Sequence, residues 1–414
     1  MSKLSFSILQ NRDFRFLLAT RMFSSFALQA QAVVVGWQVY SLTHSPLILG
    51  LTGLAEAVPA LSCALFAGHI VDTSRPHRVY IFCYLGLALN TLMLLLVGGG
   101  FIPMPQNQML FWLFAGIFFS GLGRSFAMPA SSSLVQQIVP RKDMPGATAW
   151  LSSGFHISAI AGPAIAGLVY GGYGVRAGWM LPAFFMCAAL VLVNGIRDVR
   201  HWRSAEKHLP ALQSICEGWA FMLKNRVLLA AMGLDMLAVL FGGAVAMLPA
   251  FADQILHVGS EGLGALRAAT AMGAIGTALV LAIKPMKRVS AAQMLWVVTG
   301  FGVCMIGFGL STSFWQSMFF LIVSGAFDSV SVVIRSSLVQ LLTPDHMLGR
   351  VASVSSMFII SSNELGAFES GVLAAAIGLV PSVVVGGIGT LIIAVLTAWG
   401  SPELRKTVVE VDKA

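Results

Sequence analysis

The chain has very little charge. Only 10% of its 414 residues are Asp, Glu, Lys or Arg, whereas 57% are hydrophobic. Soluble domains carry about 25% charged residues, so an ordinary water-soluble protein is excluded. A membrane-spanning helix needs roughly 20 apolar residues, and this length suits about a dozen spans joined by short loops. The composition therefore predicts an all-α membrane protein without a large soluble domain.

Other absences exclude several functional classes. The five cysteines are scattered and form no Cys-X-X-Cys pair, which argues against a disulfide or metal framework. The chain has no Gly-Lys dipeptide, so it lacks the phosphate-binding loop of an ATP-driven pump. Of eight histidines only His156 is clearly within a span, too few for the paired haem ligands of a membrane oxidoreductase. The basic residues form no run, which argues against nucleic acid as a partner. We expect no enzyme, no cofactor and no metal site.

Twelve apolar stretches lie between residues 14 and 400, and only one connection between them is long. The sequence predicts an N-terminal six-helix bundle at 1–196, a cytoplasmic linker at 197–226 and a C-terminal six-helix bundle at 227–414. Twenty of the 25 Lys and Arg residues lie in the loops on the side of the termini and the linker, and the opposite loops contain only Arg176. Basic loops face the cytoplasm, so both termini are predicted to be cytoplasmic.

The two halves share short sequence matches at constant spacing. Ser132–Gln136 reads SSLVQ and recurs at 336–340, an offset of 204; at an offset of 214, Leu49-Gly50 matches Leu263-Gly264. The first half also matches the second at Gly167 and Gly371. Two such halves indicate a parallel repeat, in which twelve helices form two pseudo-twofold six-helix bundles, the arrangement of major facilitator transporters.

Three segments carry a closer resemblance to the major facilitator superfamily. The loop from Gly68 to Arg78 resembles the family's loop signature, which implies that Gly68, Asp72, Arg75 and Arg78 form a conformational latch on the cytoplasmic side; the alternative is a solvated basic loop. Thr73 and Ser74 stand where the family has a basic residue and a glycine. Gly162, Pro163 and Gly167 are similar to the glycine-proline signature of exporter branches, and we expect them to pack helices closely. Residues 43–51 and 343–351 resemble the branch that contains the enterobactin exporter, and macrolide efflux proteins share these segments.

Charged residues inside the spans are the main candidates for function, because each costs at least about 2.5 kcal/mol at a helix centre. The candidates for substrate or proton coupling are Arg21, Glu56, Arg124, Asp235, Asp328, Arg335 and Glu364. The repeat aligns Arg21 with Asp235 and Arg124 with Asp328, so each aligned pair has opposite charges. The resemblance implies that the spans carrying them line the central cavity. Such residues could form gating pairs between the halves or bind an anionic or zwitterionic substrate.

Local spacing adds three expectations. Asp328 and Arg335 are seven residues apart on one helical face and could pair within their span. Glu56 lies in the middle of its span, as a proton carrier requires. Gln31 and Gln38 share a face of the first span and suit polar contacts. The alternative for the charged set is a group of structural ion pairs near helix ends, where long side chains reach water.

These features predict a secondary transporter, a monomer in the cell inner membrane that exports a siderophore or similar small amphiphilic compound by proton-coupled alternating access. A multidrug or macrolide efflux pump is the first alternative. A metal-ion exporter or a nutrient importer is less favoured, and a membrane scaffold or receptor would not need charges buried in its spans.

Overall fold

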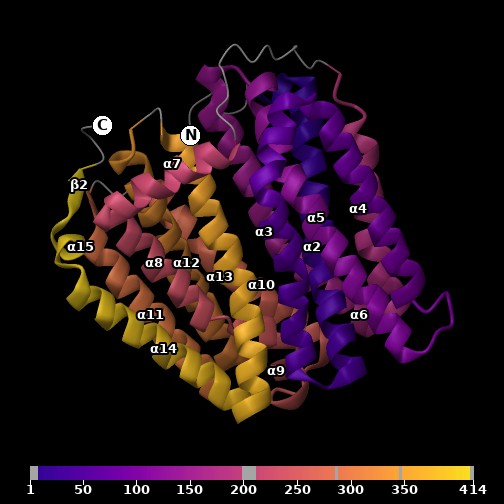
Figure 1. The fold of residues 1–414 in the computed structure, drawn as a ribbon. Coiled ribbons are helices and arrows are strands. Elements are labelled where there is room, and N and C mark those ends of the chain that lie inside the picture. The colour runs from indigo at the N-terminus through magenta and orange to yellow at the C-terminus, as the bar shows by residue number, and fades with distance from the viewer. Residues whose placement is uncertain (1–7, 198–210, 285–287, 345–346, 411–414) are drawn as a thin grey trace. The chain divides into compact units, whose positions relative to one another are not determined.

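The computed structural model describes residues 8–197, 211–284, 288–344 and 347–410, and nearly all of them lie in helices (Figure 1). The first half contains η1 (Ile8–Gln10), α2 (Arg12–Thr43), α3 (Pro46–Thr73), α4 (Pro76–Gly98), α5 (Gln106–Ile138), η2 (Arg141–Asp143) and α6 (Met144–Val193). Pro46 and Pro76 each begin a helix, where the missing N–H of proline has no partner to lose. The expected breaks before these two prolines are therefore helix boundaries.

The second half contains α7 (Ala211–Lys224), α8 (Arg226–Phe241), η3 (Ala244–Met247), α9 (Leu248–Gln254), α10 (Gly259–Ile283), β1 (Arg288–Ser290), α11 (Ala291–Leu310), α12 (Phe314–Leu342), α13 (Leu348–Ile377), α14 (Leu379–Gly400), α15 (Pro402–Lys406) and β2 (Val408–Glu410). The two strands pair antiparallel, with Arg288 opposite Glu410. This small sheet joins the start of α11 to the end of the chain.

Nine segments of the described residues are long and apolar enough to cross a membrane. One of them, Arg141–Val193, spans 53 residues and contains two helices, because Gly174 adopts φ 82°, a conformation that favours glycine. The helices α2 and α13 are not among the nine, but their 32 and 30 residues correspond to about 48 and 45 Å, more than the roughly 30 Å of a hydrocarbon core. With both halves of α6, these helices give the twelve spans predicted from the sequence.

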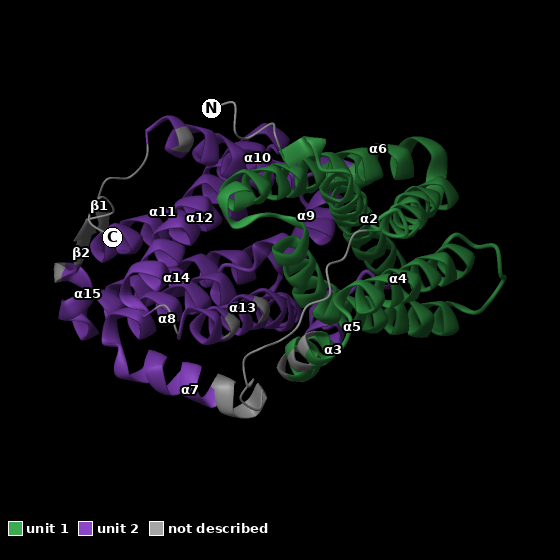
Figure 2. Cartoon of the chain, turned by 90° about the horizontal axis from the view of Figure 1, so that it is seen from above, with its two compact units in different colours: residues 1–42, 58–211, 259–264 green, residues 43–57, 212–258, 265–414 purple. Residues whose placement is uncertain are grey.

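The chain forms two compact units, which Figure 2 colours separately. Unit 1 comprises residues 1–42, 58–211 and 259–264, and unit 2 comprises residues 43–57, 212–258 and 265–414. These units differ from the ranges 1–196 and 227–414 expected from the sequence in two short stretches. The beginning of α3 packs with unit 2 and the first turn and a half of α10 packs with unit 1.

Each unit has its own apolar core. In unit 1 the core includes Phe14, Leu17, Tyr80, Leu134 and Met186, and in unit 2 it includes Met222, Leu228, Met294, Ile334 and Leu338. These residues are fully or almost fully buried. Since lipid tails are as apolar as leucine, close packing rather than hydrophobic burial holds such helices together.

Polar side chains of the first span lie inside unit 1. Gln31 donates a hydrogen bond to Oγ of Ser120 at 2.9 Å. Gln38 donates to the carbonyl oxygen of Gly98 at 2.8 Å and accepts a hydrogen bond from the indole N–H of Trp179 at 2.6 Å. The polar contacts expected for both glutamines are confirmed, and each one ties α2 to a neighbouring helix.

The part of the linker that the structure describes is largely helical, which the sequence interpretation did not anticipate. Helix α7 packs on α13: Glu217 forms an ion pair with Arg350, and the rings of Trp219 and Phe358 lie 5.2 Å apart. A Cβ at Gly218 would lie 2.8 Å from the carbonyl oxygen of Arg350, so this glycine permits the close approach. Residues 198–210, with Arg200, Arg203 and Lys207, lie outside the described residues.

Side-chain exposure repeats between α5 and α12 at the offset found in the sequence. On α5, Arg124, Met128, Ser132 and Gln136 are exposed, and on α12 the residues 204 positions later, Asp328, Val332, Ser336 and Gln340, are also exposed. Residues between them, such as Leu134 and Leu338, are buried in both helices. The repeat therefore extends from sequence to the face that each helix presents.

Candidate functional site

A buried ion pair lies inside unit 2, between α8 and α12. Asp235 and Arg335 are only 5% and 6% exposed, and a guanidinium nitrogen of Arg335 contacts the carboxylate of Asp235. The Ser331 hydroxyl donates a second hydrogen bond to this carboxylate at 2.6 Å. The carboxylate and the guanidinium thus provide each other with hydrogen-bond partners, which two buried charged groups need to offset their loss of water.

This pairing differs from the expected contact between Asp328 and Arg335. The spacing of seven residues was compatible with one helical face, but exposure separates the two: Asp328 is exposed and Arg335 is buried. Arg335 turns instead toward α8, where Asp235 offers a carboxylate in the helix interface. Spacing within one helix could not reveal that partner, because it lies about 100 positions away in the chain.

The equivalent place in unit 1 holds a cation beside hydroxyl groups. Arg21, which the repeat aligns with Asp235, lies half-buried on α2 and acts electrostatically on Tyr80 and Tyr84 of α4. The Tyr84 hydroxyl lies 2.8 Å from the Ser24 hydroxyl and 3.1 Å from that of Tyr80. The sequence interpretation missed both tyrosines, although Tyr80 and Tyr84 are two of only five in the chain.

Arg124 and Asp328 occupy corresponding positions in the middle of their helices. Each side chain is exposed and belongs to the strip of exposed residues on its helix. Ionisable residues within spans almost always face a bundle interior or a water-filled cavity. The strip on α5 in unit 1 and the strip on α12 in unit 2 therefore each carry one ionisable group at mid-helix.

A third charged set lies in unit 2. The carboxylates of Glu56 on α3 and Glu364 on α13 both act electrostatically on the guanidinium of Arg267 on α10. The cationic neighbour of Glu364 is therefore Arg267 on α10. Arg267 is not among the candidates named from the sequence, because nothing local indicates which acids approach it.

Glycines bring several of these helices into close contact. A Cβ at Gly162 would lie 2.9 Å from Cβ of Gln29 on α2, and a Cβ at Gly167 would lie 2.8 Å from Cα of Gly264 on α10. Gly162 and Gly167 thus each lie at a close approach between helices. The contact of Gly167 with Gly264 has a counterpart in unit 2, where a Cβ at Gly50 would lie 2.8 Å from Cα of Gly371. The two contacts involve the glycines that the sequence repeat aligns.

The residues expected to form the cytoplasmic latch are only partly described. Arg75, between α3 and α4, and Arg78, in the first turn of α4, are both exposed, and Gly68 has open space where a Cβ would be. The side chain of Asp72 lies outside the described residues. The latch therefore stays a prediction from the resemblance.

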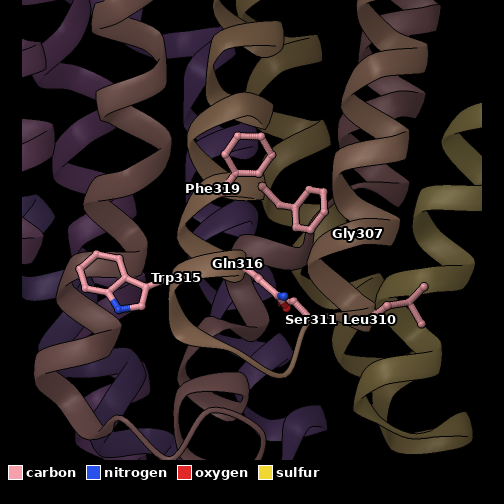
Figure 3. Close-up of a pocket in the computed structure, with 7 residues that line it drawn as sticks. Gly307, Leu310, Ser311, Trp315, Gln316 and Phe319 are labelled. Atoms are coloured by element: carbon pink, nitrogen blue, oxygen red, sulfur yellow. The ribbon is translucent and has the colours of Figure 1, made fainter.

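A surface hollow lies at the turn between α11 and α12. It has a volume of about 590 Å³ and is lined by Leu310, Trp315, Gln316 and Phe319 among others, which Figure 3 shows as sticks. Trp315 and Phe319 are 76% and 61% exposed, as aromatic residues at a membrane interface are. No charged residue lines this hollow, so we do not assign the transport site to it. The described residues contain no group of three or more His, Cys, Asp or Glu placed to hold a metal.

Solved structures with the same architecture define the class of protein. The chain is similar to a POT family transporter in complex with 5-aminolevulinic acid, with a TM-score of 0.75, 14% identity and coverage of 96% of this chain and 97% of that one. It is also similar to a bacterial homologue of the human lysosomal transporter Spinster in an inward-facing, unoccupied conformation, with a TM-score of 0.70, 13% identity and coverage of 98% and 99%. The fold is the major facilitator fold.

Sequence comparison identifies the family within this class. The family model described as transmembrane secretion effector matches residues 3–408, and the chain belongs to this major facilitator family. Among curated proteins it is 24% identical to the enterobactin exporter EntS of Shigella boydii serotype 4 (strain Sb227) and 25% identical to EntS of Shigella flexneri. Each match covers 97% of this chain and 95% of the relative. The chain is thus a secondary transporter related over its full length to exporters.

Proposed function

We propose that the protein exports a siderophore or a similar small amphiphilic compound across the bacterial inner membrane in exchange for protons, with both termini in the cytoplasm. The single observation that carries the direction and the substrate class is the full-length similarity to enterobactin exporters. The paired sequence segments at 43–51 and 343–351 agree with it.

Charge within the spans supports this class. Arg124 and Asp328 are exposed in the middle of α5 and α12, and Arg21 lies half-buried on α2 near two tyrosine hydroxyls. An iron-free catecholate is aromatic and weakly acidic, so guanidinium donors beside aromatic residues match its chemistry.

The test is uptake into inverted membrane vesicles from cells that produce the full chain. A pH gradient, acidic inside, is imposed, and iron-free enterobactin and a macrolide are offered separately. We expect enterobactin to accumulate and a protonophore to abolish its accumulation. Accumulation of the macrolide alone would favour a multidrug efflux pump, and accumulation of enterobactin without dependence on the pH gradient would refute proton exchange. Vesicles without the protein are the control.

A further inference from the structure

A charged group in unit 2 connects three helices at membrane depth. Glu56 is ten residues from the start of α3, Arg267 eight residues from the start of α10, and Glu364 thirteen residues from the end of α13. At 1.5 Å per residue these positions lie about 15, 12 and 20 Å from the helix ends that share one side of the membrane. All three residues therefore lie within the hydrocarbon core, and both carboxylates act on the same guanidinium.

Glycine packing holds two of these helices close together. A Cβ at Gly53 would lie 2.7 Å from the carbonyl oxygen of Glu364 and 2.6 Å from Cβ of Ala367. Gly53 is one turn from Glu56 on α3, so this contact sets the two acids on neighbouring segments of α3 and α13. The contact between Gly50 and Gly371 lies a turn further along both helices.

Two carboxylates in one region of low dielectric repel each other when both are ionised, and a nearby guanidinium opposes that repulsion. The buried Nε–H of Arg267 has no hydrogen-bond acceptor among the described residues, so this group is available to donate to a carboxylate that comes nearer. A group of this kind can exchange a proton and transmit the change to adjacent helices.

The neighbouring elements carry other charged groups. Asp235 is engaged with Arg335 in the ion pair between α8 and α12, and Asp328 is exposed on α12. Glu369 follows on α13 and accepts a hydrogen bond from the Ser370 hydroxyl at 3.5 Å.

The other elements around the group carry little charge. Glu261 lies at the start of α10, where a Cβ at Gly171 would contact it. Helix α14 has no charged residue, nor has the stretch 159–170 of α6 that packs on the start of α10.

We propose that Glu56, Glu364 and Arg267 form the proton-exchange site of the transporter. A proton from the outer solvent converts one of the two carboxylates to a carboxylic acid and leaves toward the cytoplasm when the protein faces inward. Arg267 remains charged and acts as a positioning residue for the carboxylate that stays ionised. The site's role in transport rests on the proposed function, but its ability to bind a proton does not.

Proton binding is measured without any substrate. The purified full chain in lipid vesicles is examined by infrared difference spectroscopy between acidic and alkaline pH, where a protonated carboxyl gives its own carbonyl stretch. We expect Glu56→Gln or Glu364→Gln to remove one of these bands. The control, Glu369→Gln on α13, should leave that band in place. If Glu56→Gln and Glu364→Gln both keep the wild-type spectrum, the site is refuted even if the protein transports.

Transport then tests the role of the site. With equal concentrations of iron-free enterobactin on both sides of the vesicle membrane, Glu56→Gln and Glu364→Gln are expected to retain exchange of labelled for unlabelled compound. This exchange needs no net movement of protons. Accumulation driven by a pH gradient should fall to the level of protein-free vesicles. Arg267→Lys should keep part of the driven accumulation and Arg267→Gln should lose it, with gel filtration to verify folding. Driven accumulation at the wild-type level in both glutamate variants would overturn the proposal and leave the proposed function intact.

Discussion

At the residue scale, a buried ion pair stabilises the interface between α8 and α12. The Asp235–Arg335 pair is almost completely buried, and Ser331 completes its hydrogen bonding. Removal of one partner of a buried pair strands the other in low dielectric and costs about 3–5 kcal/mol. We predict that Asp235→Asn strongly lowers the thermal unfolding midpoint of the purified protein, and that Asp235→Leu combined with Arg335→Met restores most of it.

The control for this prediction is Asp328→Asn in the same unit. Asp328 is exposed, so its replacement should change the unfolding midpoint little. Equal destabilisation by Asp235→Asn and Asp328→Asn would show that the buried contact between α8 and α12 is not what stabilises the unit.

The exposed charge on α5 should matter for transport rather than for stability. Arg124 lies at mid-helix on the exposed strip of α5. We predict that Arg124→Ala abolishes export of the preferred substrate, because we propose that this cationic group binds the substrate, while the unfolding midpoint stays close to that of the wild type. Efflux from cells with matched protein levels measures this, and Gln136→Ala on the same strip is the control. Export retained by Arg124→Ala would rule out the role of this charge in the path.

At the scale of elements, glycine contacts set how closely the helices approach. A Cβ at Gly273 on α10 would lie 1.8 Å from the carbonyl oxygen of Ile322 on α12, whereas at Gly276, three residues later, a Cβ meets open space. We predict that Gly273→Ala forces α10 and α12 apart and lowers the unfolding midpoint. Gly276→Ala should be neutral or stabilising by up to about 1 kcal/mol, since alanine favours the helix. Similar midpoints for the two variants would contradict the observed packing.

At the scale of the whole molecule, the orientation in the membrane can be tested with a native cysteine. Cys216 on α7 is exposed, whereas Cys304 is buried and Cys63, Cys83 and Cys187 are partly buried. The positive-inside rule places α7 in the cytoplasm. We predict that a membrane-impermeant thiol reagent labels inverted vesicles and spares intact spheroplasts, and that Cys216→Ser removes the label. Labelling of spheroplasts at Cys216 would reverse the assigned topology.

The sequence alone determined the features that depend on composition and periodicity. Scarce charge and apolar runs predicted twelve spans, and the breaks at Pro46 and Pro76 are helix boundaries. The repeat offsets predicted which residues correspond, and exposure on α5 and α12 follows that correspondence. The segments that resemble exporters led to the family that the whole chain matches. These features are local or periodic, so one sequence contains them.

Tertiary structure decided which charged residues meet. Periodicity gives the face of a helix that a residue occupies, but not the helix that this face contacts. The sequence therefore suggested Asp328 for Arg335, where the fold supplies Asp235 from α8. It also gave Glu56 and Glu364 no common partner, whereas the fold brings Arg267 near both. Partners in a helical membrane protein are far apart in the chain, and close packing between helices, set by glycines such as Gly53, selects them.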